Sequence, residues 1–200
     1  MSELWSLEAL GADSVGRDAI AEVLASIPPG DTVMEGHRRF VADLVAEHDD
    51  VLDRTCRPGH LTASAMVLDA DRTHALLLFH TKLQRWLQPG GHADGDGHLA
   101  RVALREAVEE TGIADLLIDQ RPLDVDVHEV DPPKEDAHLH LDVRYVVLAP
   151  AGAAPVGNHE SEALEWVPVD EVASRGVDDG LLRLLTSAHA HATAARDPAR

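Results

Sequence analysis

The sequence is poor in cysteine, in basic residues and in long apolar runs, and each shortage excludes a class of protein. The single cysteine, Cys56, rules out an internal disulfide and a zinc site built from several cysteines. Only 17 lysines and arginines stand against 36 acidic residues, which gives a formal net charge of -19 at pH 7. We therefore expect no nucleic-acid partner, and we expect a metal ion between the protein and any anionic substrate.

No stretch of 18 apolar residues occurs, and the first 18 residues contain neither a basic start nor a continuous apolar segment. These features predict a cytoplasmic protein with no membrane partner. The chain has 200 residues, of which 44% are hydrophobic, so it can bury a core of its own.

The spacing of apolar residues changes at Leu61. Before that point, apolar residues recur at helical spacing in residues 14–26 and 31–48. After it, we expect strands at 61–68, 75–79, 125–130 and 138–148, and helices at 98–111 and 181–195. This order predicts an α/β (α+β) fold, with an N-terminal helical extension over residues 1–55 and a main domain over residues 56–200.

Three glutamates share one face of the expected helix 98–111. Glu109 and Glu110 follow Glu106 by three and four residues, so their carboxylates repel that of Glu106 by about 0.2–0.5 kcal/mol for each exposed pair. They also lie near the C-terminal end of the helix, where the helix dipole disfavours negative charge. A Mg²⁺ or Mn²⁺ ion would reverse both effects, because it binds carboxylate oxygens and substrate phosphates. The alternative is a solvated acidic face, which is the commoner arrangement on an arbitrary helix.

The residues around this helix favour the metal. Residues 91–113 resemble the Nudix signature, G-x5-E-x7-R-E-U-x-E-E-x-G-U, in which U is a bulky aliphatic residue. The positions that match in register are Gly91, Arg105, Glu106, Glu109, Glu110, Gly112 and Ile113. Residues 86–91 and 165–171 also look like Nudix flanks, so the resemblance extends over about residues 61–172. It implies a Nudix-type α/β/α sandwich with a mixed sheet.

The resemblance further implies a metal-dependent hydrolase that cleaves a phosphoanhydride (pyrophosphate) bond in a small-molecule substrate, such as a nucleoside diphosphate linked to another group. Glu106, Glu109 and Glu110 would bind Mg²⁺ or Mn²⁺, and Glu109, Glu110 or Glu160 would act as the general base. Arg144 would contact a substrate phosphate. Gly91, Arg105 and Gly112 would be structural positions of the signature. The family also allows a homodimer, for which the N-terminal helices would be the contact.

Two signature positions depart from the pattern. Gly97 stands where the family has a glutamate, and Ala107 replaces the first bulky aliphatic residue. In the family this glutamate is understood to hold the signature arginine, so we expect Arg105 to pair with Asp94 or Asp96 instead. The missing carboxylate also keeps open a second interpretation, a non-catalytic nucleotide-binding module with the Nudix fold.

Polar residues alternate with apolar ones along the expected strand 138–148. His138, His140, Asp142 and Arg144 point to one face, and apolar side chains point to the other. A wet cleft and a solvent-facing sheet surface explain this strand equally well.

Two further histidines favour a metal site on that face. The isopentenyl-diphosphate isomerases share the Nudix fold and hold a metal with comparable histidine and acidic residues. The matching positions here are His60, His92, His140 and Asp142. Such ligands suit Mn²⁺, Fe²⁺ or Zn²⁺, so the resemblance implies a second, transition-metal ion. An isomerase-like enzyme is thus a third interpretation, disfavoured because Cys56 lies before the sheet and not near Gly90.

Overall fold

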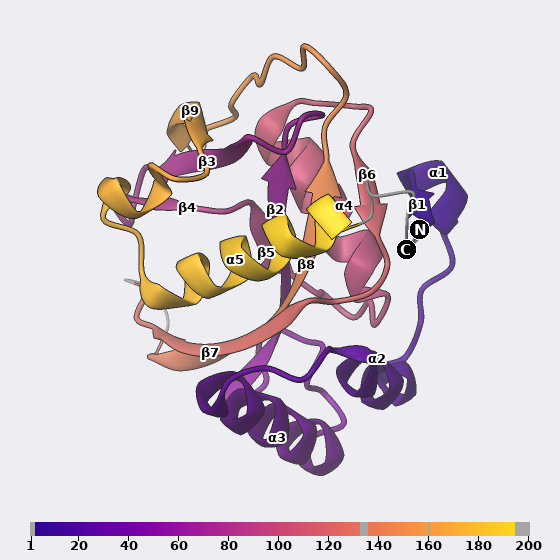
Figure 1. Ribbon diagram of the computed structural model, residues 1–200. Coiled ribbons are helices and arrows are strands. Elements are labelled where there is room, and N and C mark those ends of the chain that lie inside the picture. Colours follow the sequence, from indigo (N-terminus) through magenta and orange to yellow (C-terminus); the bar gives the residue numbers. More distant parts are fainter. Residues whose placement is uncertain (1–2, 133–135, 160, 195–200) are drawn as a thin grey trace.

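The computed structural model describes residues 3–132, 136–159 and 161–194 (Figure 1). The helices are α1 (Leu7–Leu10), α2 (Ile20–Ser26), α3 (Thr32–Glu47), α4 (Leu99–Thr111) and α5 (Asp179–Ala194), with 3₁₀ turns at Arg17–Ala19 and Val172–Arg175. The strands are β1 (Leu4–Trp5), β2 (Gly59–Leu68), β3 (His74–His80), β4 (Arg85–Leu87), β5 (Gly90–His92), β6 (Leu117–Asp119), β7 (Asp124–Val130), β8 (His138–Leu148) and β9 (Ser161–Pro168).

Strand β2 is central to the sheet, and every one of its residues is buried. It runs parallel to β8 over its whole length, from Gly59 opposite Leu139 to Leu68 opposite Leu148. It also pairs antiparallel with β3 and β5. A strand covered on both faces carries few charged residues, as β2 does. The predicted mixed sheet is therefore confirmed.

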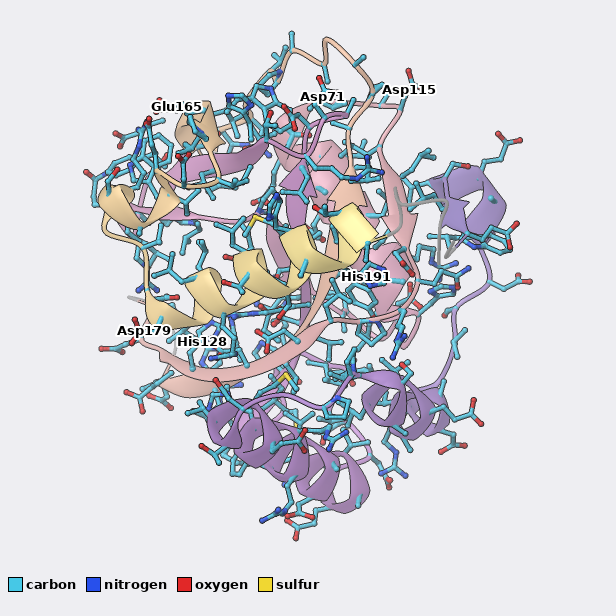
Figure 2. All side chains as sticks on the ribbon, viewed as in Figure 1. Asp71, Asp115, His128, Glu165, Asp179 and His191 are labelled. Atoms are coloured by element: carbon cyan, nitrogen blue, oxygen red, sulfur yellow. The ribbon has the colours of Figure 1, made fainter. Side chains whose placement is uncertain are left out.

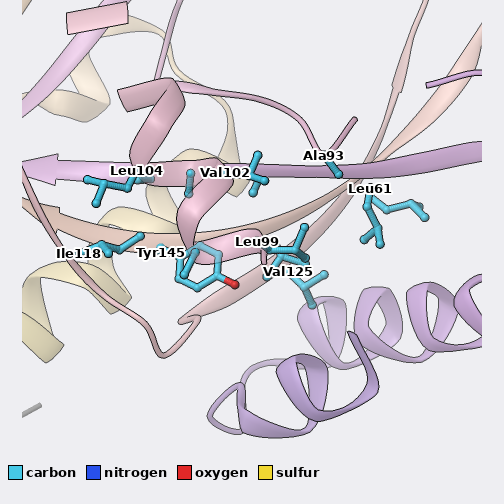
Figure 3. Close-up of a cluster of buried hydrophobic side chains, with 14 of the residues drawn as sticks. Leu61, Ala93, Leu99, Val102, Leu104, Ile118, Val125 and Tyr145 are labelled. Carbon is cyan, nitrogen blue, oxygen red and sulfur yellow. The ribbon is translucent and has the colours of Figure 1, made fainter. Parts of the chain in front are cut away.

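Helices cover both faces of this sheet, because successive residues of a strand point to opposite sides. Helix α4 packs on the face that carries Leu61 and Tyr145, and Figure 3 shows these residues with Leu99, Val102 and other core side chains. Helix α5 lies across the other face, where Met66 and Val146 are buried (Figure 1). Full burial of one such side chain stabilises the fold by about 1.5–3 kcal/mol. The α/β/α sandwich is confirmed.

Helix α4 has clear boundaries. The side chain of His98 accepts a hydrogen bond from the backbone N–H of Arg101 at its start. Gly112 ends the helix with φ 67°, a left-handed conformation that favours glycine. The left-handed backbone conformation at the end of α4 thus explains why the signature has a glycine at position 112.

The N-terminal segment differs from its prediction. We expected a helix over residues 14–26, but α2 begins at Ile20 after a 3₁₀ turn that starts at Arg17. Val15 is not helical because its backbone N–H and C=O bond across the molecule to Asp96 and Gly97. Helices α2 and α3 contribute Ile20 and Val41, among others, to the core beneath α4. The division of the chain at residues 55 and 56 stays a prediction.

Within residues 3–132, 136–159 and 161–194, no helix combines the length and the hydropathy that crossing a bilayer requires.

Candidate active site and a histidine cluster

Two glutamates of α4 pack against the double glycine of β5. Glu110 is 6% exposed, and its carboxylate accepts the backbone N–H of Gly90 at 2.9 Å. The carboxyl group of Glu106 lies so close to Gly91 that a Cβ on Gly91 would come within 2.6 Å of it. The absence of a side chain at Gly91 therefore lets the Glu106 carboxyl group lie directly against the backbone of β5. The i,i+4 spacing of Glu106 and Glu110 places both carboxylates on one side of α4.

The third glutamate, Glu109, is exposed on the same helix. Its backbone carbonyl accepts a hydrogen bond from the Asn158 side chain at 3.3 Å, which brings the loop after β8 to this end of α4. Among the described residues, the three glutamates do not form a group with all ligand atoms within 4.8 Å of one another. Mg²⁺ and Mn²⁺ still fit this donor set, since one or two carboxylates with substrate phosphates and waters suffice. The predicted base Glu160 lies outside the described residues.

The signature arginine does not pair as expected. Arg105 donates to Glu106 at 2.8 Å and to the backbone carbonyl of His92 at 3.3 Å. Asp94 is bonded instead by Arg54, and this hydrogen bond lowers the pKa of Asp94. The expectation that Arg105 pairs with Asp94 or Asp96 is therefore wrong.

Asp96 also has other hydrogen-bond partners, which explains why Arg105 does not pair with it. Its carboxylate accepts from Arg101 Nη2 at 2.6 Å and from the backbone N–H of His98 at 2.9 Å. The pair formed by Asp96 and Arg101 thus braces the loop that precedes α4.

The N-terminal segment occupies the space beside Gly97. The backbone N–H of Gly97 donates to the carbonyl of Val15 at 2.6 Å. A Cβ on Gly97 would come within 2.6 Å of the carbonyl oxygens of both Val15 and Gly16. The glutamate of the signature could not be accommodated here without moving this segment. The departure at Gly97 therefore has a steric cause in the N-terminal extension.

Arg144 is held inside the protein. It is 3% exposed, and its Nε, Nη2 and Nη1 donate to Asp142, Asp126 and Asp124 at 2.8, 3.1 and 3.4 Å. Burial alone would lower the pKa of Arg144, but these three carboxylates raise it. Arg183 adds hydrogen bonds to the same Asp124 and Asp126. The Arg144 guanidinium is therefore engaged in internal ion pairs, and its contact with a substrate phosphate stays a prediction.

Five histidines lie together on the face of β2, β5, β7 and β8 opposite α4; this histidine cluster consists of His60, His92, His128, His138 and His140. The ring centroid of His60 is 4.9 Å from that of His138, 5.0 Å from that of His140 and 5.1 Å from that of His92. Figure 2 shows His128 on β7. The centroids of His128 and His140 are 5.6 Å apart.

Burial makes the central rings neutral. It lowers the pKa of His60 to about 4 and that of His140 to about 2, and the neighbouring histidines lower both values further. The strand therefore faces neither a wet cleft nor open solvent at its centre, because Asp142, Arg144 and His138 are all buried.

The structure changes the predicted ligand set for the second metal. His60, His92 and His140 are brought together as predicted, but the carboxylate of Asp142 accepts hydrogen bonds from Thr62, Ser64 and Arg144. The sequence reasoning missed His138 and His128 as members of this group. The period of two along β8 places His138 beside His140, and the pairing of β7 with β8 sets His128 opposite His140.

A mixed sheet between two helical layers, with an acidic helix after a double glycine, defines an α/β/α sandwich domain with a candidate metal site on α4. A family model described as NUDIX domain matches residues 58–187. The chain belongs to this family, and the resemblance drawn from residues 91–113 is confirmed.

Solved structures share this fold at low sequence identity. A C. elegans Ap4A hydrolase binary complex is 16% identical, with a TM-score of 0.55, and the match covers 67% of this chain and 98% of that one. The NUDIX domain of Shewanella oneidensis NrtR complexed with ADP ribose is 22% identical, with a TM-score of 0.50 and coverage of 76% and 97%. The E. coli dihydroneopterin triphosphate pyrophosphohydrolase is 17% identical, with a TM-score of 0.50 and coverage of 64% and 92%. The search of the curated proteins found no match.

Proposed function

We propose that the protein hydrolyses a phosphoanhydride bond in a small molecule that carries a nucleoside diphosphate or a related group, with Mg²⁺ or Mn²⁺ as the cofactor. The observation that supports this proposal most directly is the placement of Glu106 and Glu110 against Gly90 and Gly91. The net charge of -19 supports the need for a cation, because the protein would otherwise repel a polyphosphate.

Glu106 and Glu110 would hold the ion, with Glu109 beside them on α4. When bound, the cation supplies Lewis-acid chemistry that offsets the negative charge on the phosphates. Other residues of the chain position the carboxylates that would bind this cation. The Gly90 N–H fixes the Glu110 carboxylate, and Arg105 orients Glu106 through their 2.8 Å hydrogen bond.

Glu109 is the described residue best suited to accept a proton from the attacking water. Its side chain is exposed, whereas Glu110 is buried and engaged with the Gly90 backbone. A base must reach the water within hydrogen-bond distance, and an exposed carboxylate can do so after substrate binds. Glu160 comes shortly after Asn158 in the sequence, and it remains the second candidate.

The substrate class rests on fold neighbours. The NrtR domain was solved with ADP ribose, and another neighbour is an Ap4A hydrolase. Both names refer to an adenosine group linked through phosphates to a second group, which supports a search among nucleotide sugars and dinucleotides.

The test is a product assay by mass spectrometry over nucleoside triphosphates, nucleotide sugars, dinucleotides and coenzymes, with Mg²⁺ and then Mn²⁺. We expect release of a mononucleotide, and a loss of at least about 100-fold in rate for Glu109→Gln, as for loss of a general base. Glu22→Gln, an exposed glutamate on α2, is the control and should keep the wild-type rate. Activity that survives in both Glu109→Gln and Glu110→Gln would contradict the proposal.

One observation favours a second function, a nucleotide-binding module without turnover. The N-terminal segment fills the place of the signature glutamate at Gly97. If the whole panel stays intact while a nucleotide raises the melting temperature, this alternative replaces the hydrolase. The isomerase-like interpretation gains no support, since Cys56 is buried and burial raises its pKa to about 11.

A further inference from the structure

We infer that the histidine cluster binds a divalent transition-metal ion, with zinc as the best match, through His60, His138 and His140. These three side chains each offer a ring nitrogen, and the three nitrogens lie within 4.8 Å of one another. Nitrogens that share a tetrahedral zinc ion are about 3.3 Å apart, given Zn–N distances of about 2.0–2.1 Å. Small rotations of the rings would therefore close the site.

His60 provides independent support, because its ring is buried without the hydrogen bonds that burial demands. The residue is 1% exposed, and neither Nδ1 nor Nε2 has a hydrogen-bond partner of regular geometry within the described part of the chain. The backbone of Cys56 acts to raise the pKa of His60, but burial and the neighbouring charges outweigh this effect. An unbonded buried polar group costs about 1–3 kcal/mol, and a metal–nitrogen bond would remove this cost.

The orientation of His138 also suits a ligand. Its Nδ1 is 2.8 Å from the backbone carbonyl of Asp136, an arrangement that makes Nδ1 the donor and leaves Nε2 with a free lone pair. Metal-bound histidines commonly donate their other nitrogen in this way. His92 stands at the edge of the group, half-buried, with its ring centroid 5.1 Å from those of both His60 and His140. It is the fourth candidate ligand.

The chemistry of these donors selects the ion. Neutral imidazoles prefer zinc and its first-row neighbours, whereas Mg²⁺ prefers oxygen. Asp142, the nearest carboxylate along β8, is held by Thr62, Ser64 and Arg144, so the site is one of nitrogen ligands.

This site is separate from the glutamates of α4. Gly91 faces Glu106, and His92 is the next residue of β5, so its side chain points to the opposite face of the sheet. The ions of the two sites therefore differ both in ligand chemistry and in place. The inference does not depend on the proposed hydrolase activity.

The test uses the full chain without a polyhistidine tag, stripped with a chelator and dialysed. Zn²⁺ binding is measured by calorimetry, and Co²⁺ binding by its visible absorption. We expect one ion per chain and an intense Co²⁺ spectrum typical of tetrahedral coordination. His138→Asn and His140→Asn should each weaken Zn²⁺ binding by at least about 100-fold, the upper end of what loss of a supporting residue costs.

Two controls separate this site from other donors. His189→Asn, on α5 and outside the histidine cluster, should bind as the wild type does. His48, Asp50 and Cys56 form the other group of described residues with ligand spacing, and Cys56→Ser removes one of its ligands. If the ion binds at the histidine cluster, this variant should also retain it. Circular dichroism confirms folding, and a variant that does not fold is replaced by the corresponding glutamine variant.

The outcomes are distinct from those of the hydrolase test. Glu110→Gln should keep zinc stoichiometry while it loses Mg²⁺-dependent turnover. Absence of stoichiometric Zn²⁺ binding by the wild type would overturn the inference, as would unchanged affinity in both His138 and His140 variants.

Discussion

The backbone N–H of Gly97 donates to the carbonyl of Val15 at 2.6 Å. This bond joins the N-terminal segment to the loop that precedes α4. The neighbouring Asp96, which lies 81 residues from Val15 in the sequence, accepts the Val15 N–H at 3.5 Å, so the segment is held by both of its backbone groups. The extension thereby supports the loop from which the candidate active-site helix begins.

Adding a methyl group at Gly97 should disturb this contact. In Gly97→Ala the new Cβ would lie 2.6 Å from the Val15 and Gly16 carbonyl oxygens, and such overpacking costs about 1–3 kcal/mol. The measurement is the free energy of unfolding in urea. Gly36→Ala is the control: its Cβ meets nothing within 4 Å, and Gly36 is helical, so that variant should gain about 0.5–1 kcal/mol. Equal stability of Gly97→Ala and wild type would refute the steric explanation.

A methyl group at Gly91 should affect catalysis more than stability. Its Cβ would approach the Glu106 carboxyl group to 2.6 Å and displace this proposed metal ligand. We expect kcat/KM to fall at least about tenfold, a loss of about 1.4 kcal/mol in transition-state stabilisation. The assay is steady-state hydrolysis over a range of Mg²⁺ concentrations, with Gly36→Ala as reference. An unchanged Mg²⁺ dependence would show that Glu106 does not hold the ion.

Removal of the Asp126 charge should destabilise the protein at neutral pH. Asp126 bonds both Arg144 and Arg183, and breaking a buried ion pair costs about 3–5 kcal/mol. Burial opposes ionisation of Asp126, but His128, Arg144 and Arg183 together lower its pKa.

The sign of the pH effect follows from that lowered pKa. A carboxyl with a folded pKa below its unfolded value of about 3.9 stabilises the protein above that pH, and the contribution is lost as pH falls toward the folded pKa. The stability gap between wild type and Asp126→Asn should thus be full at pH 7 and shrink below about pH 4. Asp115→Asn, an exposed residue labelled in Figure 2, should show little difference at either pH. A gap that does not vary with pH would argue against an ionised Asp126.

The thiol of Cys56 should be inert in the folded protein. Cys56 is 1% exposed, and burial raises its pKa to about 11, so almost no thiolate exists at about pH 8. Reaction with a chromogenic disulfide reagent should therefore be slow, and it should become fast in denaturant. Rapid labelling of the native protein would show that Cys56 is accessible and would reopen a chemical role for it.

The residues with strong local patterns were predictable. The limits of α4 follow from the spacing of its apolar residues and from Gly112. The strands β2 and β3 follow from their apolar runs, and β7 and β8 from polar residues that alternate with apolar ones. Strands β1, β4, β5 and β6 have only two or three residues, too few to show a period, and they exist because neighbouring strands offer backbone partners.

Tertiary partners decided what the sequence could not. The resemblance implied a phosphate contact for Arg144, but it could not show that β7 brings Asp124 and Asp126 to this arginine and that α5 brings Arg183 to the same two carboxylates. Arg105 pairs with Glu106 because Asp94 and Asp96 are already paired with Arg54 and Arg101. In each case the deciding contact depends on the folded arrangement, so the pattern around the arginine alone does not reveal it.

The ten-residue parallel register between β2 and β8 also governs when the histidine cluster can assemble. Strands β2 and β8 are about 80 residues apart in sequence, as the contact between Thr62 and Asp142 shows. Loop closure over that distance must precede any contact between His60 and His140, and parallel long-range pairing is slow. The three imidazoles would thus not be close enough to share an ion in early folding species. The appearance of a tetrahedral Co²⁺ spectrum during refolding would therefore report when β2 and β8 pair.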